Sequence, residues 1–238
     1  MPNVVVILPA RLGSTRFPGK ALVDVRGKSL LQRCYESVCW NGFDAYVASS
    51  DHLIIQEADR IGAKSVLTSD HPTNGTERVL EAANILDLDE NTILVNCQAD
   101  QFGWTDPDFL NDPIEAAKKD TTGELVFTVY APACGRYDLD SVHSVKVIES
   151  KWDGEIDFSR SIRDNWNVLG VHYGVYVARK RAFEVYGRLS PTEREQDERL
   201  EQLRWPFEIK PISVKADPWK VDTPGDLQIF LMAGGSVL

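Results

Sequence analysis

The sequence has less positive than negative charge. Its 238 residues carry 26 lysines and arginines against 36 aspartates and glutamates, which gives a formal net charge of −10. A protein that coats nucleic acid needs a basic surface, so this composition excludes a general nucleic-acid-binding role. A small anionic ligand is still compatible with the composition, because a few local cations can bind one inside an acidic protein.

Long hydrophobic runs are also absent. No apolar run approaches the roughly 18 residues that are needed to cross a bilayer. The first apolar run, Val4–Leu8, has no basic leader and continues directly into Pro9, so we interpret it as a buried strand and not as a signal peptide. We therefore expect a cytoplasmic protein that has no membrane partner.

Cysteines are few and widely spaced. The four are Cys34, Cys39, Cys97 and Cys134. None of them forms a Cys-x-x-Cys pair, so the spacing predicts neither a zinc site nor a disulfide framework. We expect free thiols, as in a reducing cytoplasm.

Short β-rich runs alternate with helical patterns in the first half of the chain. We predict strands at Val4–Leu8, Ala45–Ala48, Ser65–Thr68 and Thr92–Cys97, and helices at Ser29–Trp40, His52–Ile61 and Glu77–Leu86. This alternation is typical of parallel βαβ units. The strands are almost continuously apolar, which is typical of a sheet that is covered by helices on both faces.

The second half of the chain has more strands and turns. We predict strands at Leu125–Tyr130, Ser144–Ile148, Val171–Val177 and Phe207–Val214, and helices at Pro191–Arg204 and Asp226–Ala233. No linker or internal repeat interrupts the chain. We therefore expect a single α/β domain over residues 1–238, with a mainly parallel sheet flanked by helices and a smaller region at about residues 125–190.

The loop that follows the first strand, Pro9–Lys20, concentrates cations, hydroxyls and glycines. Ligands of open α/β sheets bind at this end of a strand. Glycines let a backbone approach a ligand closely, and arginine and lysine neutralise phosphate oxygens. The loop is not a Walker loop, because Ala21 follows Lys20 where serine or threonine is required, and it is not a dinucleotide fingerprint. We interpret it as a phosphate-binding loop.

Two further segments indicate an anion site and a metal site. Gly75 and Thr76 begin a predicted helix, where free amides attract anions, and Arg78 adds a cation. Asp100 follows a buried strand, where a carboxylate can bind Mg²⁺. Helix capping is the alternative interpretation of both segments.

Three segments of the second half carry further candidates. His172 and Tyr176 are four residues apart on a predicted strand and so face the same side, although core packing would also explain them. Glu198–Arg204 is a charged run, which is usually a solvated helix face. Asp222 precedes a helix start at Thr223-Pro224, which has capping chemistry of its own.

These segments together resemble the CMP-Kdo synthetases, the 3-deoxy-manno-octulosonate cytidylyltransferases. The loop is similar to that family's signature after the first strand, Pro-Ala-Arg-x-x-Ser-Thr-Arg-x-Pro-Gly-Lys. Five further segments match in order and extend over nearly the whole chain: Gly75–Arg78, Asn96–Gln101, His172–Tyr176, Glu198–Arg204 and Val221–Leu227. The resemblance implies a fold of the nucleotide-diphospho-sugar transferase type and a homodimer formed through the second half. It also implies Mg²⁺-dependent attack of an acidic sugar on the α-phosphate of CTP, with a place in lipopolysaccharide biosynthesis.

The resemblance also assigns roles to individual residues. Catalytic roles fall to Lys20, Arg11, Asp100 and Asp222, and the last two would hold the metal ion. Nucleotide binding falls to Ala10, Arg11, Ser14, Arg16, Lys20, Thr76, Gln98 and Asp100. Binding of the sugar falls to Arg78, Gln98, Arg160, His172, Tyr176 and Glu201, with Arg78 and His172 on its carboxylate.

The chain departs from the family pattern on the acceptor side. Ala99 replaces a glycine, Gln101 replaces the usual glutamate, and Phe158–Ile162 lacks the proline that normally follows it. A branch of the family that uses 8-amino-3,8-dideoxy-octulosonate also has glutamine at this position. That sugar or a nonulosonate is therefore an alternative acceptor, and a non-catalytic nucleotide-binding protein is a further alternative.

Overall fold

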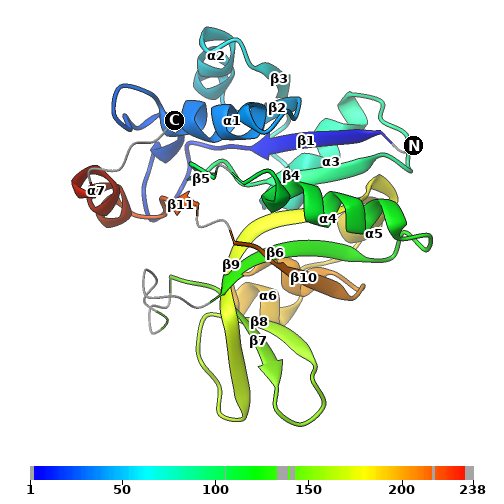
Figure 1. The fold of residues 1–238 in the computed structure, drawn as a ribbon. Helices are drawn as coiled ribbons and strands as arrows, with labels where there is room; N and C mark the ends of the chain where they lie inside the picture. Colours follow the sequence, from blue (N-terminus) through cyan, green and yellow to red (C-terminus); the bar gives the residue numbers. More distant parts are fainter. Residues whose placement is uncertain (1–2, 105, 133–138, 140–142, 216–217, 234–238) are drawn as a thin grey trace.

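The first half of the chain folds into parallel βα units in this computed structural model (Figure 1). β1 (Val4–Pro9) lies between β2 (Ala45–Ser49) and β4 (Ile93–Cys97), and β3 (Lys64–Leu67) extends the sheet beyond β2. All of these pairings are parallel. The structure describes the whole chain except residues 1–2, 105, 133–138, 140–142, 216–217 and 234–238.

Antiparallel pairings continue the sheet on its other side. β9 (Trp166–Arg179) pairs antiparallel with both β4 and β6 (Val126–Pro132), and β10 (Ile209–Ser213) lies parallel to β6. The order across the main sheet is therefore β10-β6-β9-β4-β1-β2-β3. This mixed sheet confirms the predicted fold class.

Helices cover both faces of the sheet, and β1 shows how. Val6 and Leu8 belong to a cluster on one face, with α1 (Leu30–Trp40), α2 (His52–Arg60) and α4 (Asp108–Lys119). Val5 and Ile7 belong to a cluster on the other face. There the packing helices are α3 (Gly75–Ile85) and α5 (Lys180–Gly187). Side chains alternate across a strand, so a strand buried on both faces must be apolar throughout.

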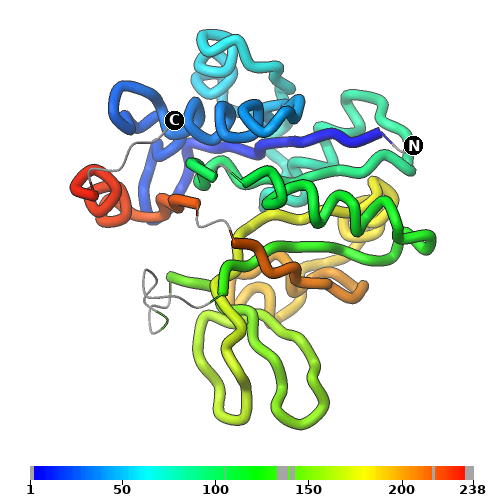
Figure 2. Tube along the Cα trace, in the orientation of Figure 1, coloured from blue at the N-terminus to red at the C-terminus, as the bar shows by residue number. Residues whose placement is uncertain are grey.

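A smaller antiparallel arm projects from the main body (Figures 1 and 2). β7 (Lys146–Ser150) pairs with β8 (Ile156–Ser159) and with the first half of β9. Since β9 is 14 residues long, it belongs to both the arm and the main sheet. Trp152, in the turn between β7 and β8, is 80% exposed.

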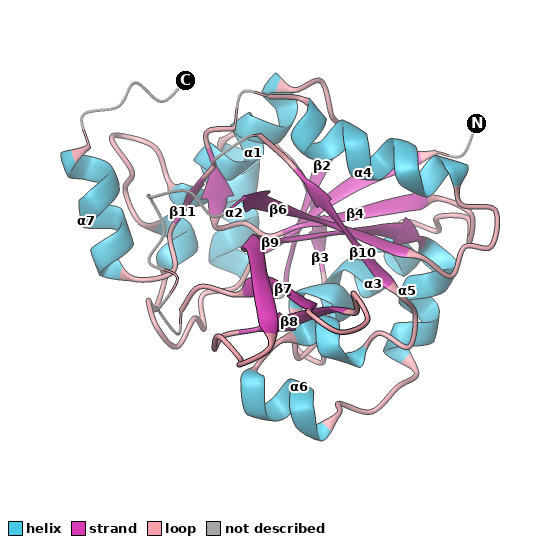
Figure 3. Cartoon of the chain, turned by 60° about the horizontal axis from the view of Figure 1, so that its bottom comes forward, coloured by secondary structure: helices cyan, strands magenta, loops and turns pink. Residues whose placement is uncertain are grey.

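The last described segment contributes to a separate two-stranded sheet and places residue 222 beside residue 100. β11 (Trp219–Lys220) pairs antiparallel with β5 (Gln101–Phe102). α7 (Pro224–Met232) follows, and its N-terminus is closed by a capping box in which Thr223 and Asp226 satisfy each other's backbone amides. Figure 3 shows α7 at the left end of the molecule, apart from the main sheet.

The expected helix over Pro191–Arg204 is wrong, because the chain breaks inside it. α6 (Glu193–Glu198) ends at Arg199, which has a φ of 53°, and the 3₁₀ helix η2 (Glu201–Arg204) follows. A left-handed residue cannot lie inside a right-handed helix. The break turns η2 inward, so Gln202 and Arg204 are buried.

The structure also contains elements that the sequence interpretation missed. They are α4, α5, β5, β8, β11 and a short 3₁₀ helix, η1 (Lys20–Leu22). Pro113 lies inside α4 and lowers the helical signal there. α5 directly follows β9 with no intervening turn, so its boundary leaves no glycine or proline mark in the sequence.

Candidate active site

Two adjoining cavities open at the carboxyl ends of β1 and β4, which is where open α/β sheets bind ligands. Their volumes are about 580 Å³ and 220 Å³. The residues shared by both walls are Pro9, Ala10, Arg11, Arg16, Gln98 and Asp100. Five of these six are predicted site residues, and Pro9 adjoins them. The predicted phosphate loop therefore lies between the two cavities.

The loop after β1 is held by backbone contacts. The Gly19 amide donates to the Leu12 carbonyl at 2.9 Å, and the Leu12 amide donates to Asp51 Oδ2 at 2.8 Å. Gly19 has a φ of 72°, a conformation that glycine adopts without strain, and it ends the loop at the start of η1. This turn directs the side chain of Lys20 into the smaller cavity.

Lys20 joins two carboxylates that are distant in the sequence. Its Nζ lies 2.7 Å from Asp100 Oδ2 and 3.4 Å from Asp222 Oδ1. Burial on its own would lower the pKa of Lys20, but the attraction of Asp100 and Asp222 outweighs burial and raises it. Lys20 is therefore held as a cation between the two carboxylates that were predicted to converge.

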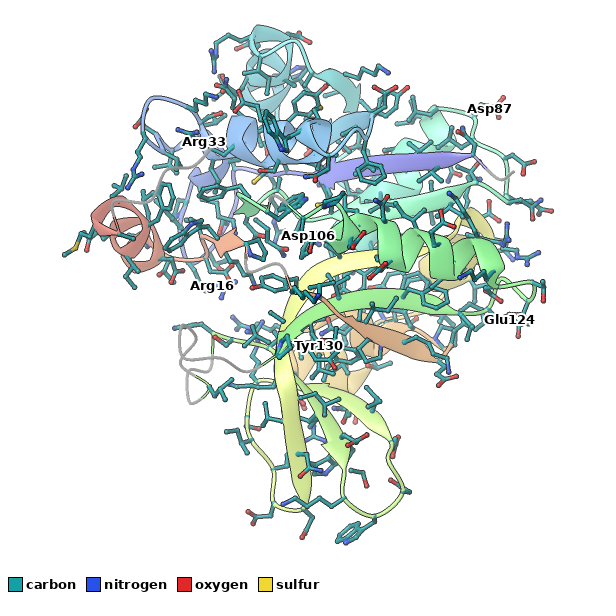
Figure 4. All side chains as sticks on the ribbon, in the orientation of Figure 1. Arg16, Arg33, Asp87, Asp106, Glu124 and Tyr130 are labelled. Carbon is teal, nitrogen blue, oxygen red and sulfur yellow. The ribbon has the colours of Figure 1, made fainter. Side chains whose placement is uncertain are left out.

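Asp222 is surrounded by positive charge. Its Oδ1 accepts from Arg16 at 2.8 Å as well as from Lys20, and its Oδ2 lies 3.1 Å from Lys220 Nζ. Figure 4 labels Arg16, which lies near β11. Burial would raise the pKa of Asp222, yet Lys220, Lys20 and Arg16 together hold it well below its usual range.

Asp100 has an oxygen available for a further ligand. Its Oδ1 is buried and has no hydrogen-bond partner in the described part of the chain. Mg²⁺ is usually held by one or two carboxylates together with substrate phosphates and water, so it does not need a cluster of three protein ligands. No such cluster occurs among the described residues. The donor set of Asp100 and Asp222 therefore fits a magnesium ion.

His172 lies in the wall of the larger cavity as a neutral side chain. Burial, with a contribution from Lys220, lowers the pKa of His172 to about 3. Its Nε2 is 2.8 Å from Thr128 Oγ1, and the hydroxyl of Thr128 donates to the Val175 carbonyl at 2.6 Å. The hydroxyl must therefore accept from Nε2–H, which leaves Nδ1 as an acceptor. The expected contact of His172 with the carboxylate of the sugar stays a prediction.

Gln98 and Glu201 form one hydrogen-bonded unit. Gln98 Nε2 donates to Glu201 Oε1 at 2.8 Å, and the Thr76 amide donates to Glu201 Oε2 at 2.9 Å. Burial raises the pKa of Glu201, and the Thr76 contacts reduce this effect. A Cβ at Gly75 would lie 2.5 Å from Gln98 Nε2, and one at Gly174 would lie 2.8 Å from Gln98 Cγ. Both glycines therefore leave the room in which Gln98 packs.

Arg78 is a buried cation with no carboxylate partner in the described part of the chain. Its Nη1 donates to Thr68 Oγ1 and to the Ser69 carbonyl at 3.2 Å. Burial lowers the pKa of Arg78. It lines the larger cavity, so an anionic group bound there would compensate its charge.

Not every predicted site residue lines a cavity. Ser14 lines the smaller cavity, and Tyr176 lines the larger one, where its hydroxyl donates to Gln202 at 2.9 Å. Thr76 lines neither cavity, since its amide holds Glu201 and its hydroxyl accepts from Asn96. Thr76 therefore positions Glu201, and its expected contact with nucleotide stays a prediction.

Arg160 is likewise placed outside both linings. Its Nε donates to the Glu198 carbonyl at 2.9 Å, and its Nη1 donates to the His143 carbonyl at 3.3 Å. This geometry gives no support to the expected contact between Arg160 and the sugar. The residues that we did not anticipate include Gln202, Arg199 and Lys220, which all line the larger cavity. Gln202 lies inside the Glu198–Arg204 segment that resembles the family, whereas no sequence pattern marks Lys220 as a site residue.

The two cavities are locally positive in an acidic protein. Their walls carry seven basic side chains and four carboxylates, although the chain has a net charge of −10. The basic ones are Arg11, Arg16, Lys20, Arg78, Arg199, Arg204 and Lys220. Arg204 is neutralised by ion pairs with Glu195 and Glu77, whereas Arg11 forms no hydrogen bond or ion pair with any described residue. This arrangement suits an anionic ligand.

Other expectations concern the chain outside the site. Cys34, Cys39 and Cys97 are free thiols, whereas Cys134 lies outside the described residues. Among the described residues, no helix has the length and apolar character that crossing a membrane requires.

Comparisons with known proteins agree with this geometry. A model of a family described as cytidylyltransferase matches residues 5–212. A 3-deoxy-manno-octulosonate cytidylyltransferase from Geotalea daltonii is 34% identical, and the alignment covers 96% of this chain and 97% of that protein. An 8-amino-3,8-dideoxy-manno-octulosonate cytidylyltransferase from Shewanella pealeana is 31% identical and covers 95% and 96% of the two chains.

Solved structures show the same similarity. CMP:2-keto-3-deoxy-manno-octonic acid synthetase in complex with CTP superposes with a TM-score of 0.80 at 28% identity, covering 97% of this chain and 98% of that one. HddC from Yersinia pseudotuberculosis shares the fold, with a TM-score of 0.66 at 16% identity over 99% of this chain and 100% of its own.

Proposed function

This chain belongs to the cytidylyltransferase family, and on that premise we propose that it activates an acidic 3-deoxy sugar with CTP. The products are a CMP-sugar and pyrophosphate. The curated relatives named above support this activity. The observation that carries the proposal is the meeting of a phosphate-sized cavity and a larger one at Lys20, Asp100 and Asp222.

The smaller cavity is the site for the triphosphate. Arg11, Arg16 and Lys20 line it together with the hydroxyls of Ser14 and Thr15. Arginine and lysine form charge-assisted hydrogen bonds with phosphate, and hydroxyls donate to the remaining oxygens. Arg11 needs no rearrangement for this role, because it has no partner among the described residues. Arg16 and Lys20 are held in place by Asp222 and Asp100 before the nucleotide binds.

The larger cavity is the site for the acceptor. Arg78 is the cation for the sugar carboxylate, since it is buried there without a carboxylate of its own. His172 Nδ1 accepts a hydrogen bond from a sugar hydroxyl. Gln98 and Glu201 present further polar atoms, with Glu201 fixed by the Thr76 amide. Binding both reactants in adjoining cavities removes most of the entropic barrier to their meeting.

Asp100 and Asp222 are the residues that would hold Mg²⁺. When bound, the ion would lower the pKa of the attacking anomeric hydroxyl and neutralise charge on the α-phosphate. The hydroxyl releases its proton to solvent, its oxygen forms a bond to the α-phosphorus, and the bond from that phosphorus to the bridging oxygen breaks. Arg11, Arg16 and Lys20 stabilise the negative charge that develops on the leaving pyrophosphate. No side-chain nucleophile is required.

One observation favours a second acceptor, the 8-amino sugar. Gln101 is 1% exposed and lines the larger cavity, and its buried Oε1 has no partner in the described part of the chain. Because Gln101 Oε1 is a neutral hydrogen-bond acceptor, it fits an O–H or an N–H group of the sugar. The Shewanella pealeana relative named for the 8-amino sugar is only a few per cent less identical than the first.

A panel of acceptors tests the proposed function. The purified protein would be incubated with CTP, Mg²⁺ and 3-deoxy-manno-octulosonate, its 8-amino analogue or a nonulosonate, and pyrophosphate release would be measured. We expect release that depends on an acceptor and on CTP, with one of the two octulosonates preferred. The absence of release with every acid would refute the proposal and favour a non-catalytic nucleotide-binding protein.

The arm provides a surface for a homodimer. Trp152 is 80% exposed in the turn between β7 and β8, and these two strands project from the main body together with the first half of β9 (Figure 1). An exposed tryptophan is costly in water and common at interfaces. Light scattering on the wild type should give the mass of two chains.

The free thiols of Cys34, Cys39 and Cys97 are consistent with a protein that works in a reducing cytoplasm.

A further inference from the structure

We propose that Lys220 is a built-in counter-cation of Asp222 that competes with a divalent metal ion for this carboxylate. The proposal rests on the metal-dependent nucleotidyl transfer proposed above and concerns how tightly the site binds its metal. A lysine in this place would keep the metal affinity of the substrate-free site low.

Lys220 is the second residue of β11. β11 is only two residues long, and its pairing with β5 sets Lys220 opposite Gln101. Lys220 Nζ lies 3.1 Å from Asp222 Oδ2, and the two side chains are 23% and 9% exposed. Lys220 lines the larger cavity but not the smaller one. Its ammonium group therefore covers the oxygen of Asp222 from the acceptor side.

Asp100 and Asp222 differ in how many of their oxygens are already engaged. Asp100 presents a buried Oδ1 without a partner, so this oxygen is ready for a ligand. Both oxygens of Asp222 are engaged, Oδ1 by Arg16 and Lys20 and Oδ2 by Lys220. A metal ion that uses both carboxylates must therefore displace a cation from Asp222.

The three cations around Asp222 do not all line the same cavity. Arg16 and Lys20 line the smaller cavity, where the phosphates of CTP offer them other anionic partners. Lys220 does not line that cavity, and Asp222 is the only carboxylate of the described part of the chain with which it forms an ion pair. When CTP binds, Lys220 is therefore the cation that still opposes a metal ion at Asp222.

The test compares Mn²⁺ binding to wild type, Lys220→Met and Lys220→Arg, without substrates, by the electron paramagnetic resonance of free Mn²⁺. Lys210→Met is the matched control, because Lys210 also pairs with a carboxylate two residues away, at 2.7 Å from Glu208, but on an exposed strand outside the site. We expect Lys220→Met to bind Mn²⁺ at least about tenfold more tightly, which equals about 1.4 kcal/mol. Lys220→Arg and Lys210→Met should match the wild type.

Equal Mn²⁺ affinity in wild type and Lys220→Met, including binding too weak to detect in both, would overturn the proposal. So would tighter binding by Lys210→Met, because the effect would then reflect net charge alone. Circular dichroism of each variant ensures that folded proteins are compared. Since Mn²⁺ binding is measured without turnover, this result is independent of the acceptor panel. If no acid in the panel supports pyrophosphate release but Lys220→Met binds Mn²⁺ more tightly than the wild type, the result counts against the proposed activity and not against the role of Lys220.

Discussion

The burial of a neutral His172 predicts how the stability of the protein responds to acid. In the unfolded chain a histidine takes up a proton near pH 6.5, whereas the folded protein lowers the pKa of His172 to about 3. Between these values the unfolded state binds one more proton than the folded state. The stabilising contribution is therefore complete above pH 6.5 and is lost progressively as the pH falls towards 3.

The size of the effect follows from the same two values. One proton of difference corresponds to about 1.4 kcal/mol per pH unit, so lowering the pH from 7 to 5 should cost about 2 kcal/mol through this residue. Typical domains have a free energy of unfolding of about 5–15 kcal/mol, so the loss is readily measured. Phe158, Tyr176 and Thr128 contact the imidazole, and its remaining side faces the larger cavity.

The assay is urea unfolding, followed by tryptophan fluorescence at a series of pH values from 7 to 4.5. His172→Gln retains a hydrogen-bonding side chain but cannot take up the proton, so its stability should fall less steeply with acid than that of the wild type. His71→Gln is the control, because His71 is exposed and should leave the wild-type slope unchanged. Parallel pH curves for wild type and His172→Gln would refute the reasoning.

Three further variants test the parts of the site. Lys20→Met should raise the KM for CTP about 10- to 100-fold, since a charge-assisted hydrogen bond contributes about 1.5–3 kcal/mol, while the KM for the sugar stays nearly constant; an unchanged KM for CTP would count against the phosphate role. Asp100→Asn should lower kcat by a factor on the order of 1000 while near-ultraviolet circular dichroism stays native, and near-normal turnover would remove Asp100 from the metal site. Arg78→Met should raise the KM for the acidic sugar at least about tenfold with that for CTP retained, and Arg78→Lys should recover part of the loss. Initial rates of pyrophosphate release measure all three.

Local patterns in the sequence were sufficient to predict the strands β1 to β4 and the α-helices between them. β1, β2, β3 and β4 and the helices between them lie within about two residues of their predicted positions, because apolar runs and helical periodicity are local signals. The place of the phosphate loop followed from the same pattern, since the carboxyl end of a parallel strand is where ligands bind.

The parts that could not be predicted depend on contacts between distant segments. Nothing local marks the left-handed Arg199 that ends α6, and the charged run around it is compatible with one long helix. The Thr76 amide donates to Glu201, which is 125 positions away, and no local pattern marks this contact. Lys220 becomes a site residue only because β11 pairs with β5. Such pairings are decided by packing of the whole chain and not by local propensity.

The junction of Lys20, Asp100 and Asp222 has a consequence for how the protein is made. Lys20 and Asp100 are 80 positions apart, and Lys20 and Asp222 are 202 positions apart. A ribosome that stops after residue 100 but before residue 222 would release a polypeptide that contains the whole β1–β4 region and Asp100 but lacks Asp222. Contacts of such long range also form late and slowly in folding. Only a chain that has been fully translated and folded would therefore be active, and truncated by-products would be inactive rather than partly active.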